Sequence, residues 1–392
     1  MEPEIDPLRC YADQVLRLAA KSPWYEGRAP QPVIPDEGSP KPVCFYLPQF
    51  HTIPENDAWW GEGFTEWTNV TRAVPQYIGH EQPRLPDALG FYDLSHIDPI
   101  RKQVELARHY GIHGFCFYYY WFSGRRILEK PLELFLAAAD IDFPFCICWA
   151  NENWTRGRNG SEDILLRQDH HNEKPDQFAV DVAPILRDPR YIRVGGKPLL
   201  IIYRPPIIPD FAARVTRWRE VFRGEGVGEV AVYMVQGFLR YDPRPWLCDG
   251  AIEFPPHNIG FHYNPSETSA FAVVNPNYSG TIVTAERVLK RARHSQAQDH
   301  DYPWIRGCNP SWDNEARRPG RGWTMHGTTP DFFERWLRYI TGEGHPGPVR
   351  NPENYVFINA WNEWAEGAYL EPDQRFGYAH LNRIARVLQS SG

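Results

Sequence analysis

Short apolar runs alternate with longer amphipathic segments along most of this chain. Eight runs predict strands, at residues 43–47, 114–120, 143–149, 198–203, 230–235, 250–254, 305–309 and 355–360. Several of them lack strict alternation, as expected for strands that are buried on both faces. Segments with apolar residues at helical spacing lie between most of these runs, at 98–110, 127–139, 174–186, 209–223, 282–295, 331–340 and 375–389.

Alternating strand and helix patterns predict a parallel sheet, and eight such units favour a closed (β/α)8 TIM barrel over an open doubly wound sheet. We expect this barrel to span residues 43–392. Residues 1–42 predict an N-terminal extension, with a helix over residues 6–21 and a proline-rich linker over 23–42. Two long loops, at about 48–97 and 255–280, are expected to be functional because long loops inside compact domains usually are.

Composition narrows the possible functions. The net charge of -7 argues against a nucleic-acid partner. Aromatic residues make up 14% of the chain, and their faces can either fill a core or stack on sugar rings. No run approaches the roughly 18 apolar residues of a membrane span, and the charged first 28 residues lack the apolar region of a signal peptide. We therefore expect a cytoplasmic protein with no membrane span, and the sequence predicts no oligomeric state.

The cysteine pattern predicts neither disulfides nor metal. The chain has seven cysteines, an odd number, and none stands in a CxxC pair or in Cys/His ligand spacing. We interpret them as buried free thiols. The sequence also contains no phosphate-binding loop and no HExxH motif, so no metal and no cofactor are predicted, and His51 and His257 are more simply rim residues than ligands.

Polar and aromatic residues gather where the predicted strands end, which is where a barrel of this kind builds its active site. A Trp, Tyr or Glu at one strand end is weak evidence alone, but the convergence predicts one cavity suited to a carbohydrate. The candidate substrate-binding residues are Gln49, His51, Trp60, Glu66, Trp67, Tyr119, Trp121, Trp149, Asn151, Glu152, Trp154, Tyr203, Glu253, His257, Trp312, Asp313, Trp361 and Asn362.

Glu363 and Glu366 follow the last predicted strand and are the candidate catalytic residues. Three positions apart on one helical turn, they would share a face, with Cβ atoms about 5–6 Å apart. Glycosidic cleavage uses two such carboxyl groups, whereas acids in a first helical turn can also be merely a solvated helix start. The flanking Trp361 and Trp364 favour a site. In an alternative assignment, Glu152 or Glu253 is a direct nucleophile and Glu366 the acid.

Several long segments occur in order along residues 43–388, among them FYLPQFHTIPENDAWWGEGFTEWTNV (45–70), YGIHGFCFYYYWF (110–122), CWANENWTR (148–156), RDPRYIRVGGKPLLIIYRP (187–205), EFPPH (253–257), PSWDNEARR (310–318) and FINAWNEWAEGAYLEPD (357–373). In these segments the chain resembles the WbsX-like proteins, which are similar to glycoside hydrolase family 99 and are associated with lipopolysaccharide biosynthesis. The resemblance implies a (β/α)8 barrel. Characterised relatives are endo-acting α-mannosidases with the signature Asn-Glu-Trp-His-Glu-Gly, and residues 362–367 look like it, with Ala365 in place of His.

The resemblance also implies a mechanism. Glu363 would deprotonate the sugar's own 2-hydroxyl, which attacks the anomeric carbon and gives a 1,2-anhydro sugar. Glu366 would be the general acid and then the base that activates water, with net retention. This chemistry needs a 2-hydroxyl trans to the leaving group, as in α-mannose or α-rhamnose. Strand-end position and resemblance together favour Asn151, Glu152, Trp154, Tyr203, Glu253 and Asp313 as substrate contacts.

Two other functions stay open. Association with surface-polysaccharide (O-antigen) assembly suggests glycosyl transfer or transglycosylation, although Asp140-Ile141-Asp142, a literal D-x-D, precedes a predicted strand and is interpreted as a turn at the bottom of the barrel. A glycan-binding protein without turnover would also explain the aromatic clusters. The paired carboxyl groups favour an enzyme, a glycosidase, over such a binding module.

Overall fold

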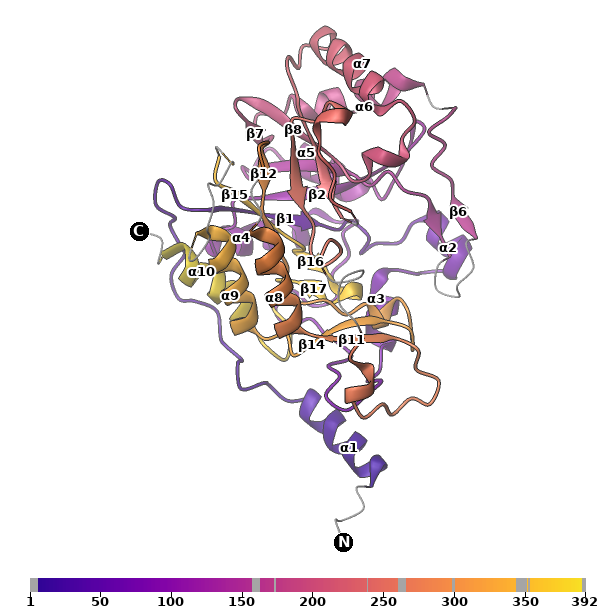
Figure 1. The fold of residues 1–392 in the computed structure, drawn as a ribbon, viewed down its shortest axis with the longest axis vertical. Helices are drawn as coiled ribbons and strands as arrows, with labels where there is room; N and C mark the ends of the chain where they lie inside the picture. Colours follow the sequence, from indigo (N-terminus) through magenta and orange to yellow (C-terminus); the bar gives the residue numbers. More distant parts are fainter. Residues whose placement is uncertain are drawn as a thin grey trace.

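A computed structural model describes residues 6–156, 163–172, 174–237, 239–259, 266–297, 300–342, 351 and 353–389. Its centre is a parallel β-barrel (Figure 1). The strands are β1 (Lys41–Tyr46), β2 (Gly114–Phe122), β4 (Phe145–Trp149), β8 (Lys197–Ile202), β9 (Ala231–Gln236), β10 (Gly250–Glu253), β12 (Trp304–Ile305), β13 (Gly307–Cys308) and β15 (Tyr355–Ile358). They follow the order β12-β10-β9-β8-β4-β2-β1-β15-β13. All eight predicted strands are therefore confirmed.

The seventh predicted strand closes the barrel as two short halves. β12 pairs with β10, whereas β13 pairs with β15 at the other end of the strand order. Between the halves, the carbonyl of Arg306 accepts a hydrogen bond from the backbone N–H of Phe357. One segment thus joins both edges of the sheet, and the fold is a nearly closed (β/α)8-type barrel, as predicted.

Aromatic side chains fill the barrel interior. Phe45 of β1 and Phe254, just after β10, meet edge to face with ring centroids 4.9 Å apart. These two strands are not neighbours in the sheet, so the contact crosses the inside of the barrel. Phe45 also contacts Phe357 from β15 at 5.4 Å. The interior is therefore a packed core beneath the loops, and space for a ligand lies above it, at the carboxyl ends of the strands.

Helices cover the outside of the barrel. They are α4 (Ile97–His109), α5 (Lys130–Ala137), α6 (Pro175–Leu186), α7 (Phe211–Gly224), α8 (Ala285–Gln296), α9 (Pro330–Thr341) and α10 (Ala379–Gln389). Figure 1 shows α8, α9 and α10 side by side along one flank. Short helices α2 (Pro54–Trp60) and α3 (Glu66–Arg72) lie in the long loop after β1. The connection after β9 holds only a 3-10 turn, η3 (Arg244–Trp246), which agrees with its poorly helical sequence.

Three of the helices around the barrel, α5, α8 and α10, begin three or four residues later than their sequence patterns predict. Residues 282–284 belong to β11 (Thr281–Thr284), which pairs with β14 (Trp323–His326) outside the barrel sheet. Residue 127 belongs to β3 (Arg125–Ile127), which pairs with β2. Before α10, the carboxylate of Asp373 accepts the backbone N–H groups of Arg375 and Phe376 and holds a turn there. In each case the backbone N–H and C=O groups bond elsewhere before the helix begins.

The N-terminal helix, α1 (Pro7–Leu18), projects at one end of the long axis of the molecule (Figure 1). The Asp6 side chain caps it, and Gln14 ties it to the barrel loops by donating to the carbonyls of Tyr77 and His80. The proline-rich segment then lies against the barrel, where Glu26 pairs with Arg383 and Arg386. The structure describes the predicted loop 255–280 except for residues 260–265. Residues 1–5 of the predicted extension and residues 390–392 of the predicted barrel also lie outside the described residues.

Candidate active site

Two adjoining cavities open at the carboxyl ends of the barrel strands. The outer cavity measures about 530 Å³ and the inner one about 270 Å³. Both are lined by Tyr120, Asn153, Trp154, Arg317 and Glu366. The outer cavity adds Gln49, Asn56, Trp60, Phe64, Glu66, Leu128, Thr155, Leu165, Asn314 and Arg318, and the inner one adds Leu47, Tyr118, Ala150, Glu152, Tyr203, Phe254, His257, Asn359 and Glu363. Of the two candidate catalytic residues, Glu366 therefore lies where the cavities meet, and Glu363 lines the inner cavity alone.

The Glu363 and Glu366 side chains come from a tight turn after β15. Asn362–Glu363 form β16, which pairs antiparallel with β17 (Ala368–Tyr369), and Trp364–Glu366 form the 3-10 turn η6 between them. Gly367 closes the turn at φ 64, and an added Cβ there would lie 3.1 Å from Asp313. The sequence spacing predicts both acids on one helical turn. The structure has a 3-10 turn that contains Glu366, and Glu363 immediately precedes it in β16.

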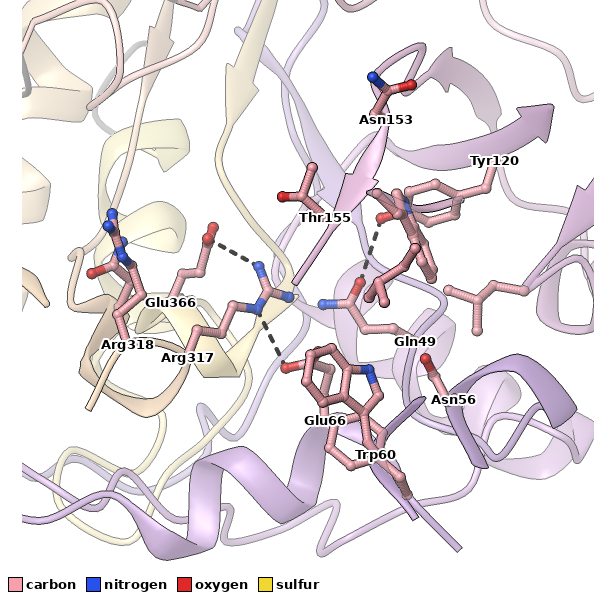
Figure 2. Close-up of a pocket in the computed structure, with 15 residues that line it drawn as sticks. Gln49, Asn56, Trp60, Glu66, Tyr120, Asn153, Thr155, Arg317, Arg318 and Glu366 are labelled. Atoms are coloured by element: carbon pink, nitrogen blue, oxygen red, sulfur yellow. Dashed lines mark hydrogen bonds and ion pairs between the residues drawn. The ribbon is translucent and has the colours of Figure 1, made fainter. Parts of the chain in front are cut away.

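Arg317 joins the two candidate carboxyl groups. It lies just after the 3-10 turn η5 (Asn314–Ala316), in the connection that follows β13. Its Nη2 lies 3.1 Å from Oε2 of Glu363, and its Nη1 lies 2.9 Å from Oε1 of Glu366. Its Nε donates to Oε2 of Glu66 at 3.3 Å. Figure 2 shows this guanidinium between Glu366 and Glu66, facing Gln49.

Gln49 forms the second support of Glu363. Its Nε2 donates to Oε2 of Glu363 at 3.0 Å, and its Oε1 lies 3.5 Å from the hydroxyl of Tyr120 (Figure 2). Burial raises the pKa of Glu363, and Arg317 and Gln49 oppose this rise. Burial likewise raises the pKa of Glu366, again opposed by Arg317. Two nearby carboxyl groups with raised pKa values favour retention of a proton near neutral pH, which suits acid–base chemistry.

A second layer of buried residues fixes this turn. The Asn362 side chain accepts from the backbone N–H of Leu47 at 2.8 Å and donates to its carbonyl at 3.0 Å. Trp364 stacks on Tyr369 with centroids 3.8 Å apart and donates from Nε1 to Glu371 at 2.7 Å. Burial raises the pKa of Glu371 to about 7. The turn that carries both carboxyl groups is thus attached to β1 and to the core.

Seven of the predicted substrate-binding residues line the cavities. Gln49, Trp60 and Glu66 line the outer one, Glu152, Tyr203 and His257 line the inner one, and Trp154 lines both. The guanidinium of Arg156 lies 5.2 Å from the ring centroid of Trp60. Glu152 forms an ion pair with Arg204, and His257 packs edge to face on Trp312 at 4.7 Å.

The other predicted substrate-binding residues line neither cavity, and the contacts given for them are with the surrounding protein. Trp121 and Trp149 pack on Phe178 outside the sheet, and Trp121 donates from Nε1 to Asp181. Tyr119 meets the same ring at 6.4 Å. Asn151 exchanges two hydrogen bonds with the backbone of Arg204. Neighbouring strand residues point to opposite faces, so a strand end supplies both cavity and core positions.

Two predicted carboxylates are among these structural residues. Glu253 is fully buried and accepts from Gln296 and from the backbone of Gly307. Asp313 accepts from His80 at 2.8 Å and from Gln82 at 2.9 Å. Despite burial, these donors and Arg84 lower the pKa of Asp313 to about 2. Their hydrogen bonds therefore organise the loops around the site.

The remaining predicted residues are also buried. Trp67 donates to the carbonyl of Tyr92 and packs on Trp364, whereas Trp361 packs on Phe115. This group also includes His51, and Trp312 and Asn362, which are described above. Burial lowers the pKa of His51. Each lies within or beside a motif whose other members line the cavities.

The sequence-based prediction missed Arg317, Arg318, Tyr120 and Asn153. Arg317 and Arg318 end the segment PSWDNEARR, from which only Trp312 and Asp313 were selected. A signal was present, since two arginines follow three polar residues in a loop at a strand end. Within the described ranges, no cluster of three or more His, Cys, Asp or Glu side chains forms a candidate metal site, and no helix there has the length and apolar composition needed to cross a bilayer.

Residues 42–384 match the family model described as glycosyltransferase WbsX. The uncharacterized protein WxcX of Xanthomonas campestris pv. campestris is 46% identical over 348 residues, which are 88% of this chain and 49% of that protein. A second strain of this organism has a relative with the same identity and coverage. The chain thus spans about half the length of the curated relatives that it matches.

Two solved structures share the fold. A glycoside hydrolase-like protein superposes with a TM-score of 0.58 at 14% identity, covering 93% of this chain and 98% of that one. The GH99 endo-alpha-mannosidase from Bacteroides thetaiotaomicron gives 0.54 at 16% identity, covering 89% and 96%. At these identities the likeness concerns the barrel fold alone.

Proposed function

This chain belongs to the family described as glycosyltransferase WbsX, and we propose that it is a retaining glycosidase that cleaves an α-linked glycan of mannose or rhamnose configuration. A bacterial surface polysaccharide is the proposed source of that glycan. The observation that carries the proposal is the pair Glu363 and Glu366, held by one arginine where two aromatic-lined cavities meet. Two carboxyl groups flanking a sugar linkage are what glycosidic cleavage requires.

The proposed reaction has two steps. Glu363 takes the proton of the sugar 2-hydroxyl, whose oxygen attacks the anomeric carbon, while Glu366 protonates the departing glycosidic oxygen. A 1,2-anhydro sugar results. Glu366 then takes a proton from water, whose oxygen attacks the anomeric carbon, and the 2-oxygen regains its proton from Glu363. Two inversions at the same carbon give net retention.

Position, rather than protonation, distinguishes the two proposed roles. Oε2 of Glu363 accepts from both Gln49 and Arg317, which oppose the effect of burial, yet the pKa of Glu363 is raised to about 8. Glu366 lines both cavities and can therefore face an oxygen that links a sugar in one to a sugar in the other. The raised pKa of Glu366 favours the protonated form that a general acid needs near neutral pH.

A product screen tests the proposal. The protein is incubated with α-mannosides, α-rhamnosides and bacterial surface polysaccharides, and released sugars are identified by mass spectrometry and NMR. We expect cleavage of at least one α-linked substrate with retained anomeric configuration. Cleavage with inversion would contradict the mechanism, and binding of a glycan without cleavage would favour a binding module.

Glycosyl transfer is the second candidate, because the family description itself names a glycosyltransferase. The same two carboxyl groups could pass a sugar to another hydroxyl in place of water. Adding an oligosaccharide acceptor to the screen separates the two functions. A hydrolase yields free sugar whether or not the acceptor is present, whereas a transferase elongates the acceptor and yields little free sugar.

A further inference from the structure

The guanidinium of Arg317 contacts three carboxylates through three different nitrogen atoms. Nε contacts Glu66, Nη2 contacts Glu363 and Nη1 contacts Glu366, at 3.3, 3.1 and 2.9 Å. Glu66 comes from α3 and the other two from β16 and η6. A guanidinium is planar and its donors have fixed directions, so these contacts set the positions of the three carboxyl groups relative to one another.

The contacts leave part of each catalytic carboxyl group open. On Glu363, Oε2 receives both Arg317 and Gln49, whereas Oε1 is buried and has no hydrogen-bond partner within the described residues. On Glu366, the contact with Arg317 goes to Oε1. A buried oxygen without a hydrogen-bond partner costs free energy unless a ligand or a water molecule donates a hydrogen bond to it. Oε1 of Glu363 is therefore the atom that a bound hydroxyl group would satisfy.

We infer that Arg317 is the positioning residue of this carboxyl pair. It contacts one oxygen of Glu363 and one oxygen of Glu366 and leaves the other oxygen of each for the sugar. The role of these remaining oxygens rests on the proposed function. The same single positive charge limits how many of the three carboxyl groups are ionised together. Arg317 therefore fixes both the geometry and the protonation of the pair.

Other charged and titratable groups face the pair and must be separated from the effect of Arg317. The outer cavity contributes Tyr120, Glu66 and Arg318, and the inner cavity contributes Tyr118, Glu152, Tyr203 and His257. Arg318 is the matched control, because its charge lowers the pKa of Glu366 while its side chain makes no hydrogen bond or ion pair among the described residues. Replacing Arg318 removes a neighbouring positive charge but keeps the three contacts of the Arg317 guanidinium.

The test is a carboxyl titration of the full chain by NMR with 13C-labelled glutamate, in which the Glu363→Gln and Glu366→Gln variants assign the two signals. We expect Arg317→Gln to raise the titration midpoints of both glutamates by about one unit or more. Arg317→Lys keeps the positive charge but loses the guanidinium contacts, so we expect smaller shifts of the two midpoints. Arg318→Gln should move the Glu366 midpoint alone, and by less than Arg317→Gln does.

Two outcomes would overturn the inference: midpoints in Arg317→Gln that stay within a few tenths of wild type, or equal shifts in Arg318→Gln. Near-UV circular dichroism checks that each variant is folded. If Arg317→Gln does not fold, the titration of Arg317→Lys still tests the inference. Once a substrate is known, Arg317→Lys should lower kcat by about 100-fold at its own optimal pH with little change in KM. The titration needs no substrate, so failure of the product screen would contradict the proposed function alone.

Discussion

The side chain of Asn362 pairs with both backbone polar groups of Leu47, accepting from its N–H at 2.8 Å and donating to its C=O at 3.0 Å. Leu47 follows β1 and Asn362 follows β15, so this pair of bonds extends the pairing of these neighbouring strands at the active-site end of the barrel. Both residues are buried, and Glu363 is the next residue along the chain. The position of Glu363 is thereby tied to the pairing of the first and last strands.

Asn362→Ala should therefore destabilise the protein. It leaves the N–H and C=O of Leu47 buried without partners, which costs about 1–3 kcal/mol for each unsatisfied group. Urea unfolding of this variant measures the loss. Asn277→Ala is the control, since Asn277 is exposed and should change the free energy of unfolding by less than about 0.5 kcal/mol. Equal stability of the two variants would show that the Leu47 contact contributes nothing.

Asp313 should make the protein sensitive to acid. The pKa of Asp313 is about 2 in the folded state, below its ordinary value of 3.8. A lowered folded-state pKa gives stability that is present above pH 3.8 and lost as the pH falls through 2, about 2 kcal/mol in all. We expect Asp313→Asn to be less stable than wild type at pH 7, with a gap that narrows below pH 4. Urea titrations at several pH values check this, and a gap that is constant with pH would contradict it.

Trp154 should supply sugar-binding surface. It lines both cavities, whereas Trp24 lies on the N-terminal segment and pairs with Asp331. Loss of one aromatic platform costs about 1–2 kcal/mol, or roughly tenfold in affinity. Fluorescence titration with an α-mannose or α-rhamnose oligosaccharide should show this weakening in Trp154→Ala and none in Trp24→Ala. Equal weakening in both variants would show that Trp154 is not a binding surface.

The barrel could be predicted from the sequence because its strands are apolar runs separated by amphipathic helices, a signal that survives without tertiary information. Two short strand pairings could not be predicted from the sequence. β11 depends on β14, which is distant in sequence, and β3 depends on a local turn that brings it against β2. The hairpin at Glu363 is of this kind. Its acids have helical spacing, but pairing of Asn362 with Tyr369 decides the backbone there.

The site could be predicted only as a set of strand-end clusters. Residues of one cluster lie on different elements and faces: Trp149, the last residue of β4, packs outside the sheet, whereas Trp154, in β5 (Trp154–Thr155) of the loop that follows, reaches the cavities. Buried polar residues add a second difficulty, since Glu253 and Asp313 have the residue types of a catalytic site and serve as hydrogen-bond acceptors in the framework. Arg317 was missed because its role exists only through three carboxylates brought together by the fold.

The most direct test of the central claim is release of sugar from the cleaved glycan by wild type, Glu363→Gln and Glu366→Gln under identical conditions. Loss of a general acid or base costs about 10²–10⁴-fold in rate, so each variant should fall by at least about 100-fold while remaining folded. Activity that survives in both variants would contradict the account and would direct attention to Glu152 or Glu253 as the reacting carboxylate.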